Sequence, residues 1–449
     1  MILQNNVPLP PDMQKKKKKR RFKRWVRVVF WSFSIALLTW ILYWPVKVLN
    51  EYWSKSPIEA ETSSVCATDA IELCNKEDSV MKVRLKRFIT SPCRLDTNDI
   101  AVCVWNLTTD TPILRWHDRE LMTPASSLKL LTAISALKRL GVSHRYIEKI
   151  MLTGNVSGGV LHGDVIFQFD DNPMVEGLEE YVSALKRKGV RKIDGRVVIN
   201  LMRTDTLRAH HTASIWDMPY NKLPILLKGA PRIAQELRYL LQQMNIDSPN
   251  PSVEYGLRIY PVLHTIYSKA TSITDVIAPM LIHSCNIKAD ALHYHTIHYA
   301  DRYKGLVGTG DTDLNVFLKE NLRYDTSGFT LNDGSGLSPK NMVNADFLIS
   351  LLRFAWKEPD IKSVLISEAL ATPGHSERRG SLSSRMTESI YEKRIFCKTG
   401  TLISIGASSL SGYAHGSNGH WYAFVVINRN SPVGESRLYQ DMLCKALVK

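Results

Sequence analysis

The chain has 449 residues, of which 44% are hydrophobic and 22% charged, and its formal net charge is +15. This composition is that of a globular protein with room for two or three domains, and it excludes a largely disordered chain. Residues 1–27 hold ten basic residues against one acidic residue, so the remainder is only mildly basic and gives no support for nucleic-acid binding.

The first element that the sequence predicts is a membrane-spanning helix over residues 28–46. This segment has 19 residues and no charge, and a bilayer core requires about 20 apolar residues in a helix. The basic run before it predicts a cytoplasmic N-terminus, with the rest of the chain outside the membrane. The alternative is a cleaved signal peptide, but its apolar core would have about 7–15 residues, and here Lys47 follows a longer run directly. We therefore expect an uncleaved single-pass anchor.

All seven cysteines follow this predicted anchor, where an exported compartment permits disulfides. An odd number leaves at least one thiol unpaired within the chain, and the pairing of the others cannot be read from the sequence. No Cys/His spacing indicates a zinc site. We expect neither a metal nor a cofactor.

The elements after the anchor begin with a polar lead. Residues 47–90 are polar and charged and predict a stalk. The β-branched and aromatic content of residues 100–107 and 111–117 predicts a β-hairpin. An apolar helix then begins near Pro124 and ends at Gly141.

Two more groups of elements complete the chain. Residues 148–265 predict a separate unit, with strands in VLHGDVIFQF and RVVINLM and a helix in VEGLEEYVSALKRKG. A helical zone covers residues 273–300, and strands from Ile395 onward precede a C-terminal helix. Strands at both ends with helices between them predict an antiparallel sheet completed by both ends of the chain, in an α+β fold.

Three short motifs carry the chemistry: Ser-x-x-Lys at Ser126–Lys129, Ser-x-Asn at Ser284–Asn286, and Lys-Thr-Gly at Lys398–Gly400. The first two recur elsewhere in the chain, so each is weak alone. Only Ser126 follows a proline at the start of an apolar helix, where its hydroxyl lies near the positive helix end and a lysine at i+3 shares its face. Lys-Thr-Gly occurs once, at the end of a predicted strand.

These residue types predict a serine nucleophile with an amine base. A serine hydroxyl is a weak nucleophile unless a base lies within hydrogen-bond reach, and Lys129 is the candidate base for Ser126. Lys129 can accept a proton only when neutral, so its pKa must fall by about 3 units from 10.4. We expect the cation of Lys398 to lower it. Ser284 is expected to relay a proton to the leaving amine, and Asn286 to hold the substrate amide and orient Lys129.

The strand that carries Lys398 is the predicted substrate platform. Lys398 is expected to attract a terminal carboxylate, with the hydroxyls of Thr399 and Thr401 as hydrogen-bond donors. An edge strand here could pair with an extended peptide, and Gly400 would permit close approach. The backbone N–H groups of Ser126 and Thr401 would then form an oxyanion hole.

With these motifs, the chain resembles the D-alanyl-D-alanine carboxypeptidase/endopeptidases known as class C low-molecular-mass penicillin-binding proteins. The resemblance runs from about residue 93 to the C-terminus and includes PASSLKLLTAISALKRLG, MLIHSCNIKADAL, DGSGLS, GSLSSR and KTGTLISIGASSLSGY. It implies a serine β-lactamase/transpeptidase-like domain with an inserted domain after the nucleophile helix. It also implies acyl-enzyme chemistry without a metal, and acylation by β-lactams. The predicted division is a cytoplasmic tail (1–27), an anchor (28–46), a stalk (47–90), a catalytic domain (91–147 and 266–449) and an inserted domain (148–265).

The chain departs from the family pattern in two places. Ser126 and Ser284 are only 158 positions apart, so we infer that one inserted domain is missing. The loop that usually has the sequence Gly-Gly-Asp-Pro in the family has the sequence Asp170-Asp171-Asn172-Pro173 here. Two further expectations concern neighbouring residues: Asp333–Ser338 forms a tight turn in which Ser335 is not catalytic, and Cys285 and Cys397 are buried, inert thiols.

The predicted function is hydrolysis of D-Ala-D-Ala-type bonds in peptidoglycan stem peptides by a bacterial inner-membrane enzyme with its catalytic domain in the periplasm or extracytoplasmic space. The expected partners are stem peptides, β-lactams as covalent inhibitors, and the membrane through residues 28–46, without nucleic acid. Two alternatives are a non-catalytic peptidoglycan-binding scaffold of the same fold and a β-lactamase. The sequence does not distinguish carboxypeptidase from endopeptidase activity.

Overall fold

The computed structural model describes residues 79–90, 95–170, 172–201, 228–256, 258–297, 314, 317–375 and 377–449. The predicted tail, the predicted anchor and most of the predicted stalk lie outside these residues. Among the residues that are described, no helix is both long enough and apolar enough to cross a bilayer.

The central sheet is antiparallel and has the strand order β11-β12-β13-β1-β2. Its strands are β1 (Ile100–Asn106), β2 (Thr111–Trp116), β11 (Ile395–Leu402), β12 (Ala407–His415) and β13 (Trp421–Asn428). The β1–β2 hairpin pairs through β1 with β13, in a register that sets Ile100 opposite Asn428. The predicted α+β fold, with a sheet built from strands distant in sequence, is confirmed.

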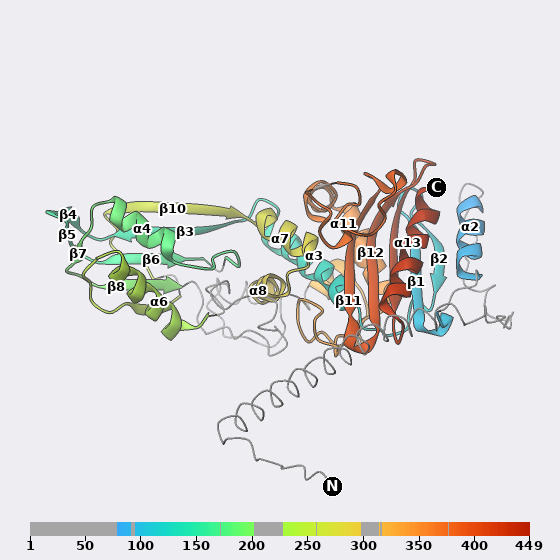
Figure 1. Ribbon diagram of the computed structural model, residues 1–449, viewed down its shortest axis with the longest axis horizontal. Helices are drawn as coiled ribbons and strands as arrows, with labels where there is room; N and C mark the ends of the chain where they lie inside the picture. The colour runs from blue at the N-terminus through green and yellow to red at the C-terminus, as the bar shows by residue number, and fades with distance from the viewer. Residues whose placement is uncertain are drawn as a thin grey trace, which may run out of the picture. The chain divides into compact units, whose positions relative to one another are not determined.

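Helices cover both faces of this sheet because the side chains of each strand alternate between its faces (Figure 1). Ala101 and Cys103 of β1 belong to a core shared with α3, α7, α8 and α11. Val102 and Val104 belong to a second core shared with α2 and α13. These helices, with the short α12, are α2 (Ser79–Thr90), α3 (Lys129–Leu140), α7 (Ile273–Ile282), α8 (Asn286–Ile297), α11 (Ala345–Lys357), α12 (Pro359–Val364) and α13 (Val433–Val448).

The predicted helical zone over residues 273–300 is divided into α7 and α8. A capping box begins α7, in which Ser272 Oγ accepts the N–H of Asp275 and the Asp275 carboxylate accepts the N–H of Ser272. The helix ends before Ser284, whose φ of 59° is left-handed. The second motif therefore begins in the break between two helices.

A second sheet is built from residues 145–272 and has the strand order β10-β3-β6-β8-β9. Its core is a separate hydrophobic cluster that includes α4 and α6. The elements of this part are β3 (Arg145–Leu152), β4 (Asn155–Ser157), β5 (Val160–His162), β6 (Val165–Phe169), α4 (Glu179–Arg187), β7 (Lys192–Ile193), β8 (Val197–Leu201), α6 (Ala230–Gln243), β9 (Ser252–Tyr255) and β10 (His264–Ser272). Strands β4, β5 and β7 form a small third sheet.

The two long strands β3 and β10 connect the second sheet to the helices around the central one. They pair antiparallel from Arg145 opposite Ser272 to Leu152 opposite His264. The predicted bounds of the inserted domain, at 148 and 265, thus fall inside these two strands. The division into a catalytic and an inserted domain stays a prediction.

Candidate active site

Ser126 lies in a tight turn rather than in the α-helix itself. A 3₁₀-helix spans Ala125–Leu128, and α3 begins at Lys129. Ala125 has a left-handed φ of 47°. Gly336 packs directly beneath this turn, where a Cβ atom would come within 1.9 Å of the Ala125 carbonyl oxygen. The turn that presents the serine is thus held by a glycine from a distant segment.

Lys129 is completely buried and contacts three oxygen atoms. Its Nζ lies 3.0 Å from Ser126 Oγ, 2.6 Å from Asn286 Oδ1 and 2.6 Å from the carbonyl oxygen of Ser335. The first two contacts join the Ser-x-x-Lys and Ser-x-Asn motifs, as the sequence predicts. The amine is therefore fixed within hydrogen-bond reach of the candidate nucleophile.

Lys398 brings the third motif to the same place. It is completely buried on β11, and its Nζ donates to Ser284 Oγ at 2.9 Å and to the Thr399 carbonyl oxygen at 2.7 Å. Burial and the nearby Lys129 amine lower the pKa of Lys398 well below its ordinary value. The sequence led us to expect Lys398 as the cation that lowers the pKa of Lys129. The structure shows two neighbouring amines, and the pKa of Lys398 is itself lowered.

The end of β11 lies against the turn that carries Ser126. At Gly400, a Cβ atom would come within 2.2 Å of Ser409 Oγ and 2.9 Å of the Ser126 backbone nitrogen. The close neighbours of this glycine are thus Ser409 and the Ser126 turn, and the expected close approach of an extended peptide stays a prediction. Strand β11 is also an edge strand of the central sheet.

The hydroxyl groups of both threonines of β11 form hydrogen bonds with other groups of the protein. Thr399 Oγ1 donates to Ser381 Oγ at 2.7 Å, and Thr401 Oγ1 donates to the Gly400 carbonyl oxygen at 2.8 Å. Thr401 Oγ1 also accepts from Arg437 Nη2 at 3.2 Å. Sequence reasoning missed this arginine, which lies on α13 and belongs to none of the three motifs.

The Asp333–Ser338 turn is the other part of the site that the motif analysis did not assign. The Asp333 carboxylate accepts the backbone N–H groups of Ser335, Gly336 and Ser338 at 3.0, 2.6 and 2.7 Å. This clamp aims the Ser335 carbonyl oxygen at Lys129, whereas the Ser335 hydroxyl accepts from Leu337 N at 3.3 Å. In the sequence, the DGSGLS string is the signal for this turn. The turn contributes to the site through the backbone carbonyl of Ser335.

Two cysteines adjoin the motif residues. Cys397 is buried as expected, and burial raises its pKa to about 12, which disfavours the reactive thiolate. Cys285 is half-buried, which differs from the expectation. Cys103, Cys285, Cys397 and Cys444 are all free thiols. The other three cysteines lie outside the described residues.

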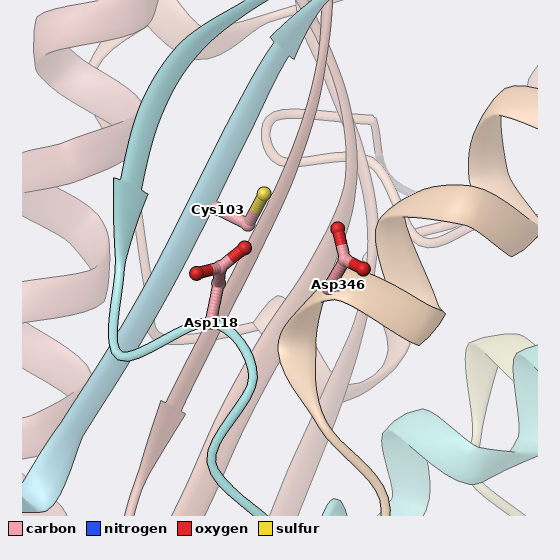
Figure 2. Close-up of side chains that lie close together, drawn as sticks. All are labelled: Cys103, Asp118 and Asp346. Atoms are coloured by element: carbon pink, nitrogen blue, oxygen red, sulfur yellow. The ribbon is translucent and has the colours of Figure 1, made fainter. Parts of the chain in front are cut away.

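A polar cluster with metal-ligand residue types lies beside the β1–β2 hairpin (Figure 2). It consists of Cys103 on β1, Asp118 after β2 and Asp346 on α11. The Arg115 guanidinium already pairs with both carboxylates, at 2.7 Å from Asp118 and 3.3 Å from Asp346. Burial, together with the two carboxylates, raises the pKa of the Cys103 thiol well above its usual range. We interpret the cluster as an ion pair that fixes the end of β2 to α11.

The loop that departs from the family pattern is turned inward. Asn172 is buried, and its amide donates to Glu148 Oε1 at 2.8 Å and accepts the N–H of Met174 at 2.9 Å. The same segment carries Glu176, which pairs with Lys288 of α8 at 3.3 Å. The segment that follows the loop thus contacts the helix of the Ser-x-Asn motif through a salt bridge, while the Asn172 side chain bonds to Glu148 and Met174.

The fold and the three motifs define the class of penicillin-binding proteins with a transpeptidase-like fold. The family model described as D-Ala-D-Ala carboxypeptidase 3 (S13) matches residues 81–222 and 264–444. The chain belongs to this family.

Individual relatives match over shorter stretches. A D-alanyl-D-alanine carboxypeptidase of Actinomadura sp. (strain R39) is 31% identical over 183 residues, which are 40% of this chain and 32% of the relative. A D-alanyl-D-alanine carboxypeptidase DacB of Haemophilus influenzae is 25% identical over 131 residues, 29% of this chain and 26% of the relative. The chain spans about a third or less of the length of the curated relatives it matches.

Solved structures share the fold over most of the chain. Penicillin-binding protein 4 from Haemophilus influenzae has a TM-score of 0.59 at 18% identity, covering 77% of this chain and 96% of its own. A predatory peptidoglycan endopeptidase from Bdellovibrio bacteriovorus has a TM-score of 0.52 at 17% identity, covering 74% and 86%. At these identities the likeness concerns the fold.

Proposed function

We propose that this chain is a serine-type D-Ala-D-Ala carboxypeptidase/endopeptidase that acts on peptidoglycan stem peptides through an acyl-enzyme on Ser126. The observation that carries the proposal is the 3.0 Å contact between Lys129 Nζ and Ser126 Oγ, with Asn286 on the same amine. The Lys398–Ser284 pair supplies a second amine and hydroxyl. The family and the printed activities of its relatives support this assignment.

Acylation begins with attack of Ser126 Oγ on the carbonyl carbon of the penultimate D-alanine. A neutral Lys129 accepts the hydroxyl proton as the bond forms. An amine with an ordinary pKa of 10.4 is protonated near neutral pH. Lowering this pKa to about 7, so that the neutral amine is populated, requires about 4 kcal/mol. Complete burial favours the neutral form of the amine, and so does a second amine nearby.

The next step collapses the tetrahedral intermediate and expels the terminal amine. The N–H groups of Ser126 and Thr401 would stabilise the oxyanion, because Gly400 brings β11 against the Ser126 turn. Ser284 Oγ, in contact with Lys398 Nζ, can deliver the proton that the leaving amine requires, and the proton that Lys129 took from Ser126 replaces it, so Lys129 is neutral again. Water then attacks the ester carbonyl while Lys129 accepts its proton. Lys129 returns this proton to Ser126 Oγ as the ester bond breaks and the free acid leaves.

The substrate chain would add to the outer side of β11 after Cys397, which already pairs with Ala371 on that side. An edge strand pairs with an extended peptide through main-chain hydrogen bonds, and β11 ends in the segment that carries Thr399 and Thr401. A terminal carboxylate at this place would meet two hydroxyls and the Arg437 guanidinium, which already donates to Thr401. We propose that these groups select substrates with a free C-terminus.

The test is incubation of the purified protein with defined muropeptides, followed by mass analysis. Monomeric pentapeptide muropeptides should lose D-alanine if the enzyme is a carboxypeptidase. Cross-linked dimers should separate into monomers if it is an endopeptidase. Both substrates remaining intact, with a folded protein, would favour the alternative of a non-catalytic scaffold.

β-Lactams are proposed as covalent inhibitors, because they present a strained amide to the same serine. A related solved structure, that of the Haemophilus influenzae protein with a TM-score of 0.58, was determined with a β-lactam bound. A β-lactamase is the rival assignment, and it requires rapid hydrolysis of the acyl-enzyme. Slow release of a fluorescent penicillin from the protein would contradict that rival, whereas fast turnover would support it.

Replacing Lys398 by alanine is expected to slow acylation and weaken binding of substrates with a terminal carboxylate, each by about 10- to 100-fold. This is the effect of losing a hydrogen bond to the charged carboxylate of the substrate, about 1.5–3 kcal/mol. The measurement is kcat and KM on a D-Ala-D-Ala peptide and on its C-terminal amide. The acid-to-amide preference should shrink in Lys398→Ala and persist in Lys445→Ala, which removes a more exposed lysine. Equal preference in Lys398→Ala and wild type would contradict the carboxylate role.

Membrane anchoring by residues 28–46 is proposed from the sequence alone. Its support is the uncharged 19-residue run after a strongly basic segment. Full-length protein should stay with membranes after alkaline extraction, with its body cleavable by protease added from the periplasmic side. Release into the alkaline supernatant would contradict the anchor.

A further inference from the structure

A buried carboxylate of α8 lies behind the Lys129 site. Asp290 is one turn beyond Asn286 on this helix, and its Oδ1 accepts the backbone N–H of Gly334 at 3.1 Å. Its other oxygen, Oδ2, is buried, and the Ser335 side chain lies close enough to the carboxylate to act on its pKa as a hydrogen-bond donor. The three motifs and the proposed mechanism do not use this group.

The backbone between Asp290 and Lys129 is held from three sides. Thr132 Oγ1 of α3 donates to the Gly334 carbonyl oxygen at 2.6 Å, and Lys129 Nζ donates to the next carbonyl, that of Ser335. A Cβ atom at Gly334 would come within 2.2 Å of His293, so the turn is pressed against α8. Asp290 therefore fixes one end of a two-residue segment whose other end orients the amine of Lys129.

Titratable side chains face Asp290 from the turn, from α3 and from its own helix α8. Asp333 faces it from the turn, Lys129 from α3, and His293 lies one turn further along α8. Lys398 of β11 interacts with Lys129 in turn. Burial, with the Asp333 charge, raises the pKa of Asp290 to about 7, although Lys129 acts in the opposite direction. A carboxylate here favours the protonated form of Lys129, and a neutral carboxyl favours the free amine.

We propose that Asp290 is a positioning residue for Lys129: it fixes the Gly334–Ser335 backbone that orients the amine, and its charge sets the pH at which that amine becomes a base. This inference rests on the proposed function, because Lys129 must be the base for Ser126. The two effects can be separated. Thr132 holds the same backbone segment without carrying a charge, whereas Asp290→Asn removes the charge and keeps an amide oxygen for Gly334.

The experiment measures the second-order rate of acylation by a fluorescent penicillin from pH 5 to 10. Neutral Lys129 is the reactive form, so the rate should rise with pH along an acid limb. Asp290→Asn should move this limb to lower pH by about 1 unit, because a nearby negative charge no longer stabilises the cation. Thr132→Val should lower the maximal rate by about 10-fold without moving the limb. Asp247→Asn, at an exposed carboxylate whose backbone pairs with Lys192 in the second sheet's part of the chain, should change neither.

An Asp290→Asn limb at the wild-type pH would overturn the electrostatic role, and an unaltered maximal rate in Thr132→Val would overturn the positioning role. Both results leave the proposed function intact, since wild type would still be acylated. A wild type that is not acylated removes the proposed function and this inference with it. Thermal unfolding confirms that each variant is folded. An unfolded Asp290→Asn protein would also contradict us, because the amide has the shape of the carboxyl and its oxygen can still accept the N–H of Gly334.

Discussion

Ser126→Ala is expected to reduce turnover of a D-Ala-D-Ala peptide by about 10⁴-fold or more, because no other group can form the acyl-enzyme. The alanine removes only Oγ, which lies in contact with Lys129 Nζ. The 3₁₀ turn, whose backbone is fixed by Gly336 and Gly400, should keep its conformation. The measurement is kcat with the purified protein, accompanied by a thermal unfolding curve.

The adjacent serine provides a matched control. Ser127 lies in the same turn but is buried away from Lys129, and its Oγ contacts Ser409 Oγ at 2.8 Å. Ser127→Ala removes an identical atom one position away and is expected to retain turnover with some loss of stability. If Ser126→Ala and Ser127→Ala both lose turnover, Ser126→Ala acts by disturbing the turn and not by removing the Ser126 hydroxyl.

Lys129→Met should lower the rate of acylation by about 10²- to 10⁴-fold, the contribution of a positioned general base. Methionine fills most of the volume of the lysine stem but cannot accept a proton. It also leaves the Asn286 side chain and the Ser335 carbonyl oxygen without this donor. The residual rate should lose the acid limb that titration of Lys129 gives the wild type.

Lys138→Met is the matched control for this change. Lys138 lies on the same helix, nine residues further on, and pairs with Glu358 at 3.1 Å with its side chain 32% exposed. Its acylation rate should stay close to wild type. A Lys129→Met protein that is folded and acylated at the wild-type rate would exclude Lys129 as the base.

The three motifs, taken together, predicted which side chains meet around Lys129. A serine nucleophile requires a base within hydrogen-bond reach, and this requirement limits the residue types that can serve. Ser126, Lys129 and Asn286 converge as expected. The α+β fold also followed from the sequence, since strands β1 and β13 are rich in β-branched and aromatic side chains. Their pairing brings together segments more than 300 residues apart.

The parts that the sequence did not predict act through the backbone or through buried charge. Ser335 contributes a carbonyl oxygen, which every residue type possesses, so its side chain carries no signal. The lowered pKa of Lys398 depends on its complete burial beside Lys129, and a three-residue motif does not encode burial. The left-handed conformation of Ser284 divides a helical zone that hydrophobic periodicity joins into one.

The most direct test of the central claim is to locate the covalent adduct formed with benzylpenicillin. The protein is treated with the antibiotic, digested, and its peptides are identified by mass spectrometry. We predict a single penicilloyl group on the hydroxyl of Ser126. An adduct on another residue, or an unmodified protein whose fold is intact, would contradict the account.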